Sequence, residues 1–264
     1  MAIEATWLGT AGFRIKAEGA EFLIDPWLRR NPEARPRQPL QPEDLAAEIK
    51  GQGLPIFITH GHFDHLQDVP LLAQAGSTAH VSVEAARTLA REGVDPGRIV
   101  RVEGDGQAFD LGAYRAAAFF SRHVKFDLPL VIKTLWRAGR RVPALMPLMK
   151  KWPAGQVLSW RFELAGRTLH HFGSGGSTPE ELGRLAKNPP EVLFAPLQGH
   201  SRIHRIALEY VRALKPKTVV VHHQDDFFPP ISQMVPAEPL VEMVRQEAPG
   251  IRVIVPELNR PFIL

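Results

Sequence analysis

The hydrophobic positions of the chain form short apolar runs that alternate with longer amphipathic stretches. Apolar residues at helical spacing predict helices, and the apolar, β-branched runs predict strands. The order of these elements indicates an α/β protein that contains two βα halves. Strands are predicted at 3–8, 12–17, 21–24, 54–59, 79–82, 99–102, 114–121, 156–164, 168–172, 192–195, 218–222 and 251–255, and helices at 42–50, 66–74, 84–92, 179–186, 203–214 and 238–246.

Residues 127–155 interrupt the alternation with apolar and basic residues in close mixture, broken by Gly139 and Pro143. No linker or short repeat is visible, so we expect a single domain over 1–264 with an amphipathic insert at about 127–155. The insert is interpreted as a helical flap over the domain or as a dimer contact. In the second case the protein would form a homo-oligomer. The alternative is a lid with affinity for acyl chains or a membrane surface, with Trp136 and Met146 over the active-site cleft.

Composition narrows the class of protein. The chain has 264 residues, 44% of them hydrophobic, which is enough for one sizeable core. It contains no cysteine, which excludes thiolate ligands and fits a reducing compartment, so we expect a cytoplasmic protein. We expect no signal peptide and no transmembrane segment. The net charge of +4 permits an anionic substrate, but no basic stripe or stacking platform indicates nucleic acid.

The segment His60-Gly61-His62-Phe63-Asp64-His65 places four metal-ligand side chains within six residues. It follows the predicted strand at 54–59, and functional residues of α/β proteins commonly lie where a strand enters a loop. Imidazole and carboxylate are ligands that suit zinc, manganese and iron. Burying them together is costly unless a cation neutralises the carboxylate. We therefore expect one or two divalent ions here, zinc first, with manganese or iron as alternatives.

This H-x-H-x-D-H motif after a strand resembles the signature of the metallo-β-lactamase superfamily. The segments TWLGTAGFRI from Thr6 and FLIDPW from Phe22 are similar to the branch with ascorbate-6-phosphate lactonases and N-acyl phosphatidylethanolamine phospholipase D. The resemblance covers nearly the whole chain except the insert. It implies a four-layer αβ/βα sandwich and a metal-dependent hydrolase.

The resemblance also implies the remaining ligands. His123 follows the predicted strand at 114–121, and His223 directly follows the one at 218–222. The neighbouring His222 then points to the other side by strand alternation. The implied ligand sets are His60, His62 and His123 for one ion, and Asp64, His65 and His223 for a second ion.

One position departs from the family pattern. Many members carry an Asp in a Gly-Asp-Thr sequence that bridges the two metals, and Ser174 stands at this place. A neutral hydroxyl is a poor bridge between two divalent cations. Three alternatives stay open, namely two metals joined only by hydroxide, a weak or absent second metal, and compensation by His170 or His171.

Metal-assisted hydrolysis is the chemistry of such a site, because a bound divalent ion lowers the pKa of water to about 7. Asp64 can orient the resulting hydroxide, and His200 is a candidate acid for the leaving group, although it also fits a surface histidine at a helix start. We expect hydrolysis of an ester, lactone or phosphodiester in a small or lipid-like anionic substrate. The alternatives are a non-catalytic or regulatory metal-binding protein on the same fold, and a nuclease.

Overall fold

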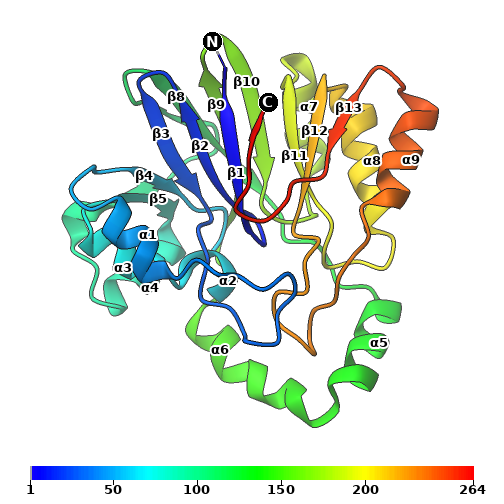
Figure 1. Ribbon diagram of the computed structural model, residues 1–264, viewed down its shortest axis with the longest axis horizontal. Helices are drawn as coiled ribbons and strands as arrows, with labels where there is room; N and C mark the ends of the chain where they lie inside the picture. Colours follow the sequence, from blue (N-terminus) through cyan, green and yellow to red (C-terminus); the bar gives the residue numbers. More distant parts are fainter. Residues whose placement is uncertain (1) are drawn as a thin grey trace.

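The computed structural model describes residues 2–264, apart from the side chains of residues 140 and 144. In this part of the chain, two seven-stranded sheets pack face to face, and helices cover their outer sides (Figure 1). The helices of the first half lie outside one sheet and those of the last third lie outside the other. The four-layer αβ/βα sandwich expected from the sequence is confirmed.

The first sheet has the strand order β14-β1-β2-β3-β4-β5-β6. Strands β1 to β3 form an antiparallel meander, whereas β3 to β6 pair in parallel and are connected through helices. The elements are β1 (Glu4–Gly9), β2 (Gly12–Ala17), β3 (Ala20–Ile24), α1 (Pro42–Glu48), β4 (Pro55–Phe57), α2 (Phe63–Leu66), α3 (Val69–Gln74), β5 (Thr78–Ser82), α4 (Val83–Arg91), η1 (Pro96–Arg98), β6 (Ile99–Val102) and β14 (Pro261–Ile263).

The second sheet has the order β13-β12-β11-β10-β9-β8-β7, antiparallel from β7 to β10 and parallel from β10 to β13. Its elements are β7 (Gln107–Asp110), β8 (Tyr114–Ser121), β9 (Val157–Leu164), β10 (Arg167–Phe172), α7 (Pro179–Lys187), β11 (Val192–Pro196), α8 (Ile203–Leu214), β12 (Thr218–His222), α9 (Glu238–Glu247) and β13 (Arg252–Ile254). The insert between β8 and β9 contains α5 (Leu128–Ala138), η2 (Gly139–Ala144) and α6 (Leu145–Lys151).

Aromatic side chains from both sheets meet in the space between them. Phe22 of β3 stacks on Phe162 of β9 with ring centroids 4.6 Å apart, and Phe13 of β2 meets Phe194 of β11 edge-on at 4.8 Å. All four side chains are fully buried. Such pairs add to the stabilisation by burial and have a preferred geometry, so they help to fix how the two sheets lie against each other. Loops that follow strands of both sheets therefore come together at one end of the sandwich.

The predicted elements differ from the structure in three places. The helix expected at 66–74 is divided into α2 and α3, because the Asp68 carboxylate between them turns away to accept the backbone N–H groups of Leu28 and Arg29 at 2.6 and 3.0 Å. Part of the motif, expected in a loop, lies in α2. The short elements η1, β7 and β14 were not predicted, because none of them contains an apolar run of four or more residues.

The insert forms an arm that extends away from the sheets, with α5 and α6 at its two ends (Figure 1). Gly139 follows α5 and Pro143 lies inside η2, where the sequence predicts breaks. Trp152 is buried in the core, but Trp136 and Met146 are 89% and 68% exposed. Our expectation that these two side chains face the cleft is therefore wrong.

None of the helices in residues 2–264 is long and apolar enough to cross a membrane. The cytoplasmic location expected from the sequence stays a prediction.

Candidate metal centre

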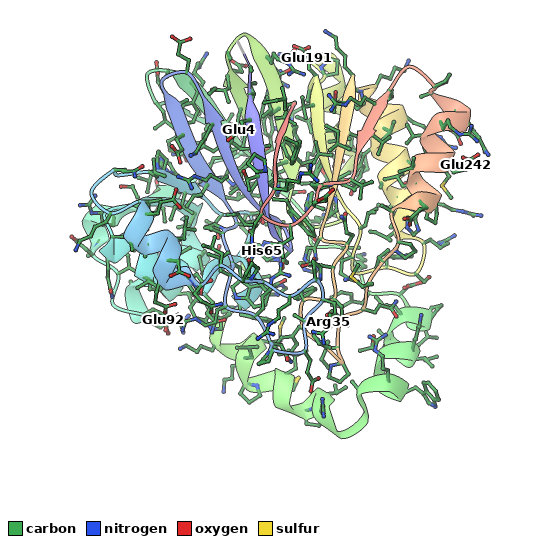
Figure 2. All side chains as sticks on the ribbon, viewed as in Figure 1. Glu4, Arg35, His65, Glu92, Glu191 and Glu242 are labelled. Atoms are coloured by element: carbon green, nitrogen blue, oxygen red, sulfur yellow. The ribbon has the colours of Figure 1, made fainter. Side chains whose placement is uncertain are left out.

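The six candidate ligands meet at the end of the sandwich where strands of both sheets stop. In Figure 2, His65 lies near the middle of the molecule, close to the ends of the strands. The contributing segments are the loop after β4, helix α2, the segment after β8 and the residue after β12. Those segments supply His60 and His62, Asp64 and His65, His123, and His223, respectively.

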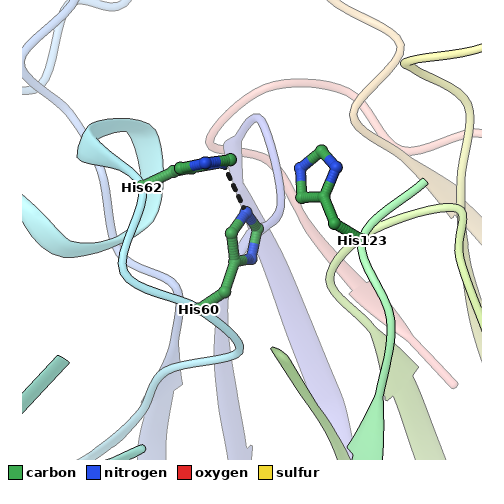
Figure 3. A group of neighbouring side chains, drawn as sticks. All are labelled: His60, His62 and His123. Carbon is green, nitrogen blue, oxygen red and sulfur yellow. Dashed lines mark hydrogen bonds between the residues drawn. The ribbon is translucent and has the colours of Figure 1, made fainter. Parts of the chain in front are cut away.

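The first triad consists of three imidazoles from two segments. His60 and His62 come from the motif, and His123 approaches them from the end of β8 (Figure 3). One ligand atom of each side chain lies within 4.8 Å of the others, and His60 Nε2 is 3.0 Å from His62 Nδ1. His123 Nδ1 donates to the carbonyl of Val124 at 2.8 Å, which leaves its Nε2 free to bind a metal.

A buried carboxylate fixes the orientation of two ligands. Asp25, at the end of β3, accepts hydrogen bonds from the Thr59 hydroxyl at 2.6 Å and from His65 Nδ1 at 2.8 Å. Since the Thr59 proton is used in this way, its Oγ1 can accept a bond from His60 Nδ1 at 3.1 Å. Both imidazoles therefore keep Nε2 for an ion, the usual support for histidine ligands. Sequence reasoning missed this role, although Asp25 directly follows a predicted strand.

The second triad is more deeply buried and carries a negative charge. Asp64 Oδ2 lies 3.6 Å from Nε2 of His65 and 3.6 Å from Nε2 of His223. His223 has a positive φ of 56°, which is uncommon for a residue with a side chain. Its N–H donates to the carbonyl of Thr10 at 2.8 Å, and this bond supports the unfavourable backbone conformation.

A buried ion pair holds the turn that carries His223. Arg30 Nη2 lies 2.7 Å from Asp225 Oδ2, and the same oxygen accepts the backbone N–H of Thr10 at 3.0 Å. Both charged side chains are almost inaccessible to solvent. The pair therefore ties the loop after β12 to the segment after β3, and the bond from Thr10 ties it to the loop after β1. No local pattern in the sequence indicates this pairing, because 195 residues separate the partners.

The charge states of the triads suit a divalent cation. Burial and the neighbouring histidines hold the pKa of His60 well below its ordinary value, and burial lowers that of His62 to about 4. Burial opposes ionisation of Asp64, but His65 and His223 outweigh it and hold the Asp64 pKa below its usual range. Burial likewise opposes protonation of His65, yet Asp25 and Asp64 raise its pKa. The first triad thus offers neutral imidazoles, and the second offers an ionised carboxylate beside histidines, a nitrogen-rich donor set that fits zinc.

Both triads lie in one cavity of about 290 Å³, and most of its remaining wall is apolar. The insert supplies one side of this wall, and helix α2 and the segments after β8 and β12 supply the rest. The apolar residues of the wall are Phe63, Val124, Phe126, Leu130, Val131, Leu135, Val142, Leu145, Met149, Phe227, Phe228 and Ile231.

Ser174 also lies in this cavity, at the position where the resemblance implies a bridging carboxylate. Its hydroxyl accepts the backbone N–H of Val124 at 2.9 Å. His170 and His171 are fully buried, and in residues 2–264 neither joins a group that could hold a metal. His171 Nε2 donates to the carbonyl of Ala11 and its ring stacks on His222, 4.6 Å away. The structure therefore does not support compensation by either histidine.

His200, the candidate acid, lies elsewhere. It lines a second cavity together with Lys133 and His204, and it is not part of the wall around the triads. Its Nδ1 accepts the backbone N–H of Arg202 at 3.0 Å and lies 3.8 Å from a carboxylate oxygen of Asp127. These contacts are those of a surface histidine at a helix start, the alternative that the sequence left open.

Comparisons with known proteins agree with this geometry. The model of the β-lactamase superfamily domain matches residues 4–223. A metal-dependent hydrolase of the group UPF0173 from Myxococcus xanthus is 31% identical over 96% of this chain and 81% of its own length. A second such hydrolase, from Carboxydothermus hydrogenoformans, is 26% identical over 84% of each chain.

Solved structures show the same fold. The metallo hydrolase Igni18 from Ignicoccus hospitalis superposes with a TM-score of 0.70 and 18% identity, over 100% of this chain and 99% of that one. An isothiocyanate hydrolase from Delia radicum gut bacteria superposes with a TM-score of 0.64 and 16% identity, over 98% of each chain. The family match, the hydrolase relatives and the two triads lead to one conclusion. The chain belongs to the metallo-β-lactamase superfamily and is a metal-dependent hydrolase.

Proposed function

We propose that this enzyme hydrolyses an ester, lactone or phosphodiester bond in a lipid-like anionic substrate, with two divalent ions at the triads. The observation that carries this proposal is the shared cavity, in which a polar floor of ligands faces a wall of apolar side chains. Ligand sites commonly combine a mostly apolar lining with a few placed polar groups. A hydrocarbon chain fits the wall, and the scissile group fits the floor.

The ligands divide into two sets in this proposal. His60, His62 and His123 hold one ion, and Asp64, His65 and His223 hold the other, with zinc favoured by the nitrogen-rich donors and manganese or iron as alternatives. When bound, such an ion acidifies a water molecule and polarises the carbonyl or phosphoryl oxygen under attack.

The protein's own side chains orient the reactants. Ionised Asp64 can accept a hydrogen bond from the attacking water, and Asp25 keeps the imidazole of His65 in place beside it. Arg137 brings a positive charge to the cavity, where an anionic group of the substrate can bind it. The proposal gives His200 no part in catalysis, because it lies outside this cavity.

A pair of variants on α5 tests the apolar wall. Leu130 lines the cavity, whereas Ile132 on the same helix is 57% exposed and is absent from the wall. We expect Leu130→Ala to lower kcat/KM for p-nitrophenyl decanoate by about tenfold, because burial of a leucine contributes roughly this much. The variant should change kcat/KM for p-nitrophenyl butyrate little, and Ile132→Ala should affect neither ester in detergent-free, vesicle-free buffer.

The same comparison can contradict the proposal. Equal losses on both esters would mean that Leu130 supports the structure rather than the substrate chain. Turnover of bis(p-nitrophenyl) phosphate alone, with neither ester cleaved, would restrict the activity to phosphodiesters.

A further inference from the structure

Helix α5 carries an apolar stripe on its outer side. Leu128, Ile132 and Trp136 recur every four residues along one helical face, and all three are exposed and absent from the cavity wall. In an ordinary surface helix this face would be turned towards the core. Trp136 is 89% exposed and Leu128 is 70% exposed, so the stripe is open to a partner.

Further apolar side chains of the insert are open to solvent. Val131 and Leu135 of α5, at the edge of the cavity, are 37% and 50% exposed, and Met146 of α6 is 68% exposed. A folded chain seldom leaves so many large apolar side chains open on one segment unless they contact something. We define the docking face as the α5 stripe of Leu128, Ile132 and Trp136.

The insert also holds the positive charge of the protein. Residues 128–155 contain six Lys and Arg and no Asp or Glu, whereas the rest of the chain has 26 basic and 28 acidic residues. The remainder alone is therefore slightly acidic, and the net charge of +4 comes from the insert. Lys125, Lys133 and Lys150 of this region are exposed to solvent.

We propose that the docking face binds an anionic membrane surface, with the apolar stripe among the lipid chains and the lysines at the headgroups. Amphipathic helices with tryptophan and leucine on one side and basic residues beside them bind membranes in this way. Charge decides between a membrane and a second copy of the chain. A twofold dimer would place the patch against itself and bring lysine against lysine.

This inference goes beyond the proposed function and would hold for any substrate. One consequence does rest on the proposed function. Leu130 and Thr134 of α5 line the catalytic cavity, so binding of the docking face to a membrane would bring that cavity close to a lipid substrate.

The test uses flotation of the full-length protein with vesicles, without any turnover. One set consists of phosphatidylcholine, and the other contains equal parts of phosphatidylcholine and phosphatidylglycerol. We expect binding to the anionic vesicles that weakens as salt is added, because screening removes the attraction of the lysines. Of the five tryptophans only Trp136 is exposed, the others being at most 2% exposed. Its emission should therefore shift to the blue on binding.

Two isoleucines provide a matched pair of variants. Ile132 on α5 is 57% exposed, and Ile263, next to the last residue of the chain, is 50% exposed. Figure 1 shows the C-terminus at the opposite end of the molecule from α5. Ile132→Ser should lower the affinity for anionic vesicles by about tenfold, whereas Ile263→Ser should leave it unchanged. Metal content and the thermal midpoint are measured for both variants.

Several results would overturn the inference. They are failure of the wild type to float with either vesicle, equal binding to both vesicle types, and equal losses in the two variants. A dimer in sedimentation that Ile132→Ser dissociates would identify a second copy as the occupant. If Ile132→Ser fails to fold, the Trp136 emission of the wild type decides the question. Loss of ester hydrolysis with intact vesicle binding would count against the proposed function alone.

Discussion

The floor and the wall of the cavity come from different kinds of structure. The candidate ligands lie in turns that follow strands or, for Asp64 and His65, in the short helix α2, and hydrogen bonds such as that from His65 to Asp25 hold the floor in place. The wall opposite comes largely from the insert, which exposes much of its apolar surface. Chemistry that needs fixed geometry is thus built on the shared core, whereas the proposed substrate contacts lie on a segment that can change without disturbing the core.

The largest expected effect is on the floor. His60→Ala, His62→Ala and His123→Ala should each remove the ion of the first triad and abolish hydrolysis. Loss of a side chain that merely supports a ligand costs about 10–100-fold, so loss of a ligand should cost more. Elemental analysis and activity are the measurements, and His204→Ala, whose imidazole bonds the Pro236 carbonyl, is the control. Unchanged metal content in all three variants would refute the ligand assignment.

The support beneath the floor can be examined through pH. Glu181 is fully buried, its carboxylate accepts the Ser121 hydroxyl at 2.7 Å and also bonds Ser159, and burial raises its pKa to about 7. A raised pKa means that the folded state favours the protonated acid. The stability that protonated Glu181 contributes to the folded state is fully present below its ordinary pKa near 4.5. It is lost as the pH rises through about 7.

Glu181→Gln should therefore gain stability relative to the wild type between pH 5 and 8, by on the order of 3 kcal/mol. The measurement is the difference between the two free energies of unfolding at each pH. The buried histidines, whose lowered pKa values make stability rise with pH, are present in both proteins. Their contribution therefore cancels in the difference. A difference that stays constant with pH would show that Glu181 titrates normally.

The orientation of His65 offers a smaller effect. Asp25→Asn keeps the shape of the side chain but removes the charge that accepts from His65 and Thr59. We expect the affinity of the second triad for zinc to fall about 10–100-fold. A metal titration checks this, with Asp110→Asn on the exposed strand β7 as the control. Equal affinities in the Asp25 variant and the wild type would remove Asp25 from the support of the site.

Ser174→Asp should strengthen binding of the second ion, since it restores a charged oxygen donor inside the cavity. An increase on the order of tenfold is expected, because added ligand charge raises cation affinity. Ser174→Asn provides the uncharged control of similar size. The same zinc affinity in all three proteins would mean that Ser174 is not at the bridging position.

The smallest effect is expected where the wall joins the body of the protein. Arg137 of α5 donates to the carbonyls of Pro230 and Ile231, each at 2.6 Å, and to Gln233 at 2.7 Å. Arg137→Ala should raise KM for long-chain esters about threefold to tenfold, because hydrogen bonds of this kind contribute on the order of 1 kcal/mol. Metal content should not change. Arg141→Ala, on the exposed part of the arm, is the control, and an equal rise there would count against Arg137 as an anchor.

The sequence by itself determined the α/β alternation and the position of most strands and helices. It also determined the local half of the site, because the spacing of His60 to His65 fixes how those side chains follow one strand. The resemblance, rather than the spacing, supplied His123 and His223, which the structure then brings to the same cavity.

Only the tertiary structure decided which side of α5 faces the domain. That helix has apolar residues on both sides, so periodicity could not show that Leu130 lines the cavity while Trp136 points outward. Long-range partners were equally inaccessible to a sequence argument. Asp25 and Asp225 act on His65 and His223 through contacts between segments far apart in the chain, and such contacts leave no periodic trace. The structure places His200 in a second, neighbouring cavity, because following a strand does not decide which cavity a side chain enters.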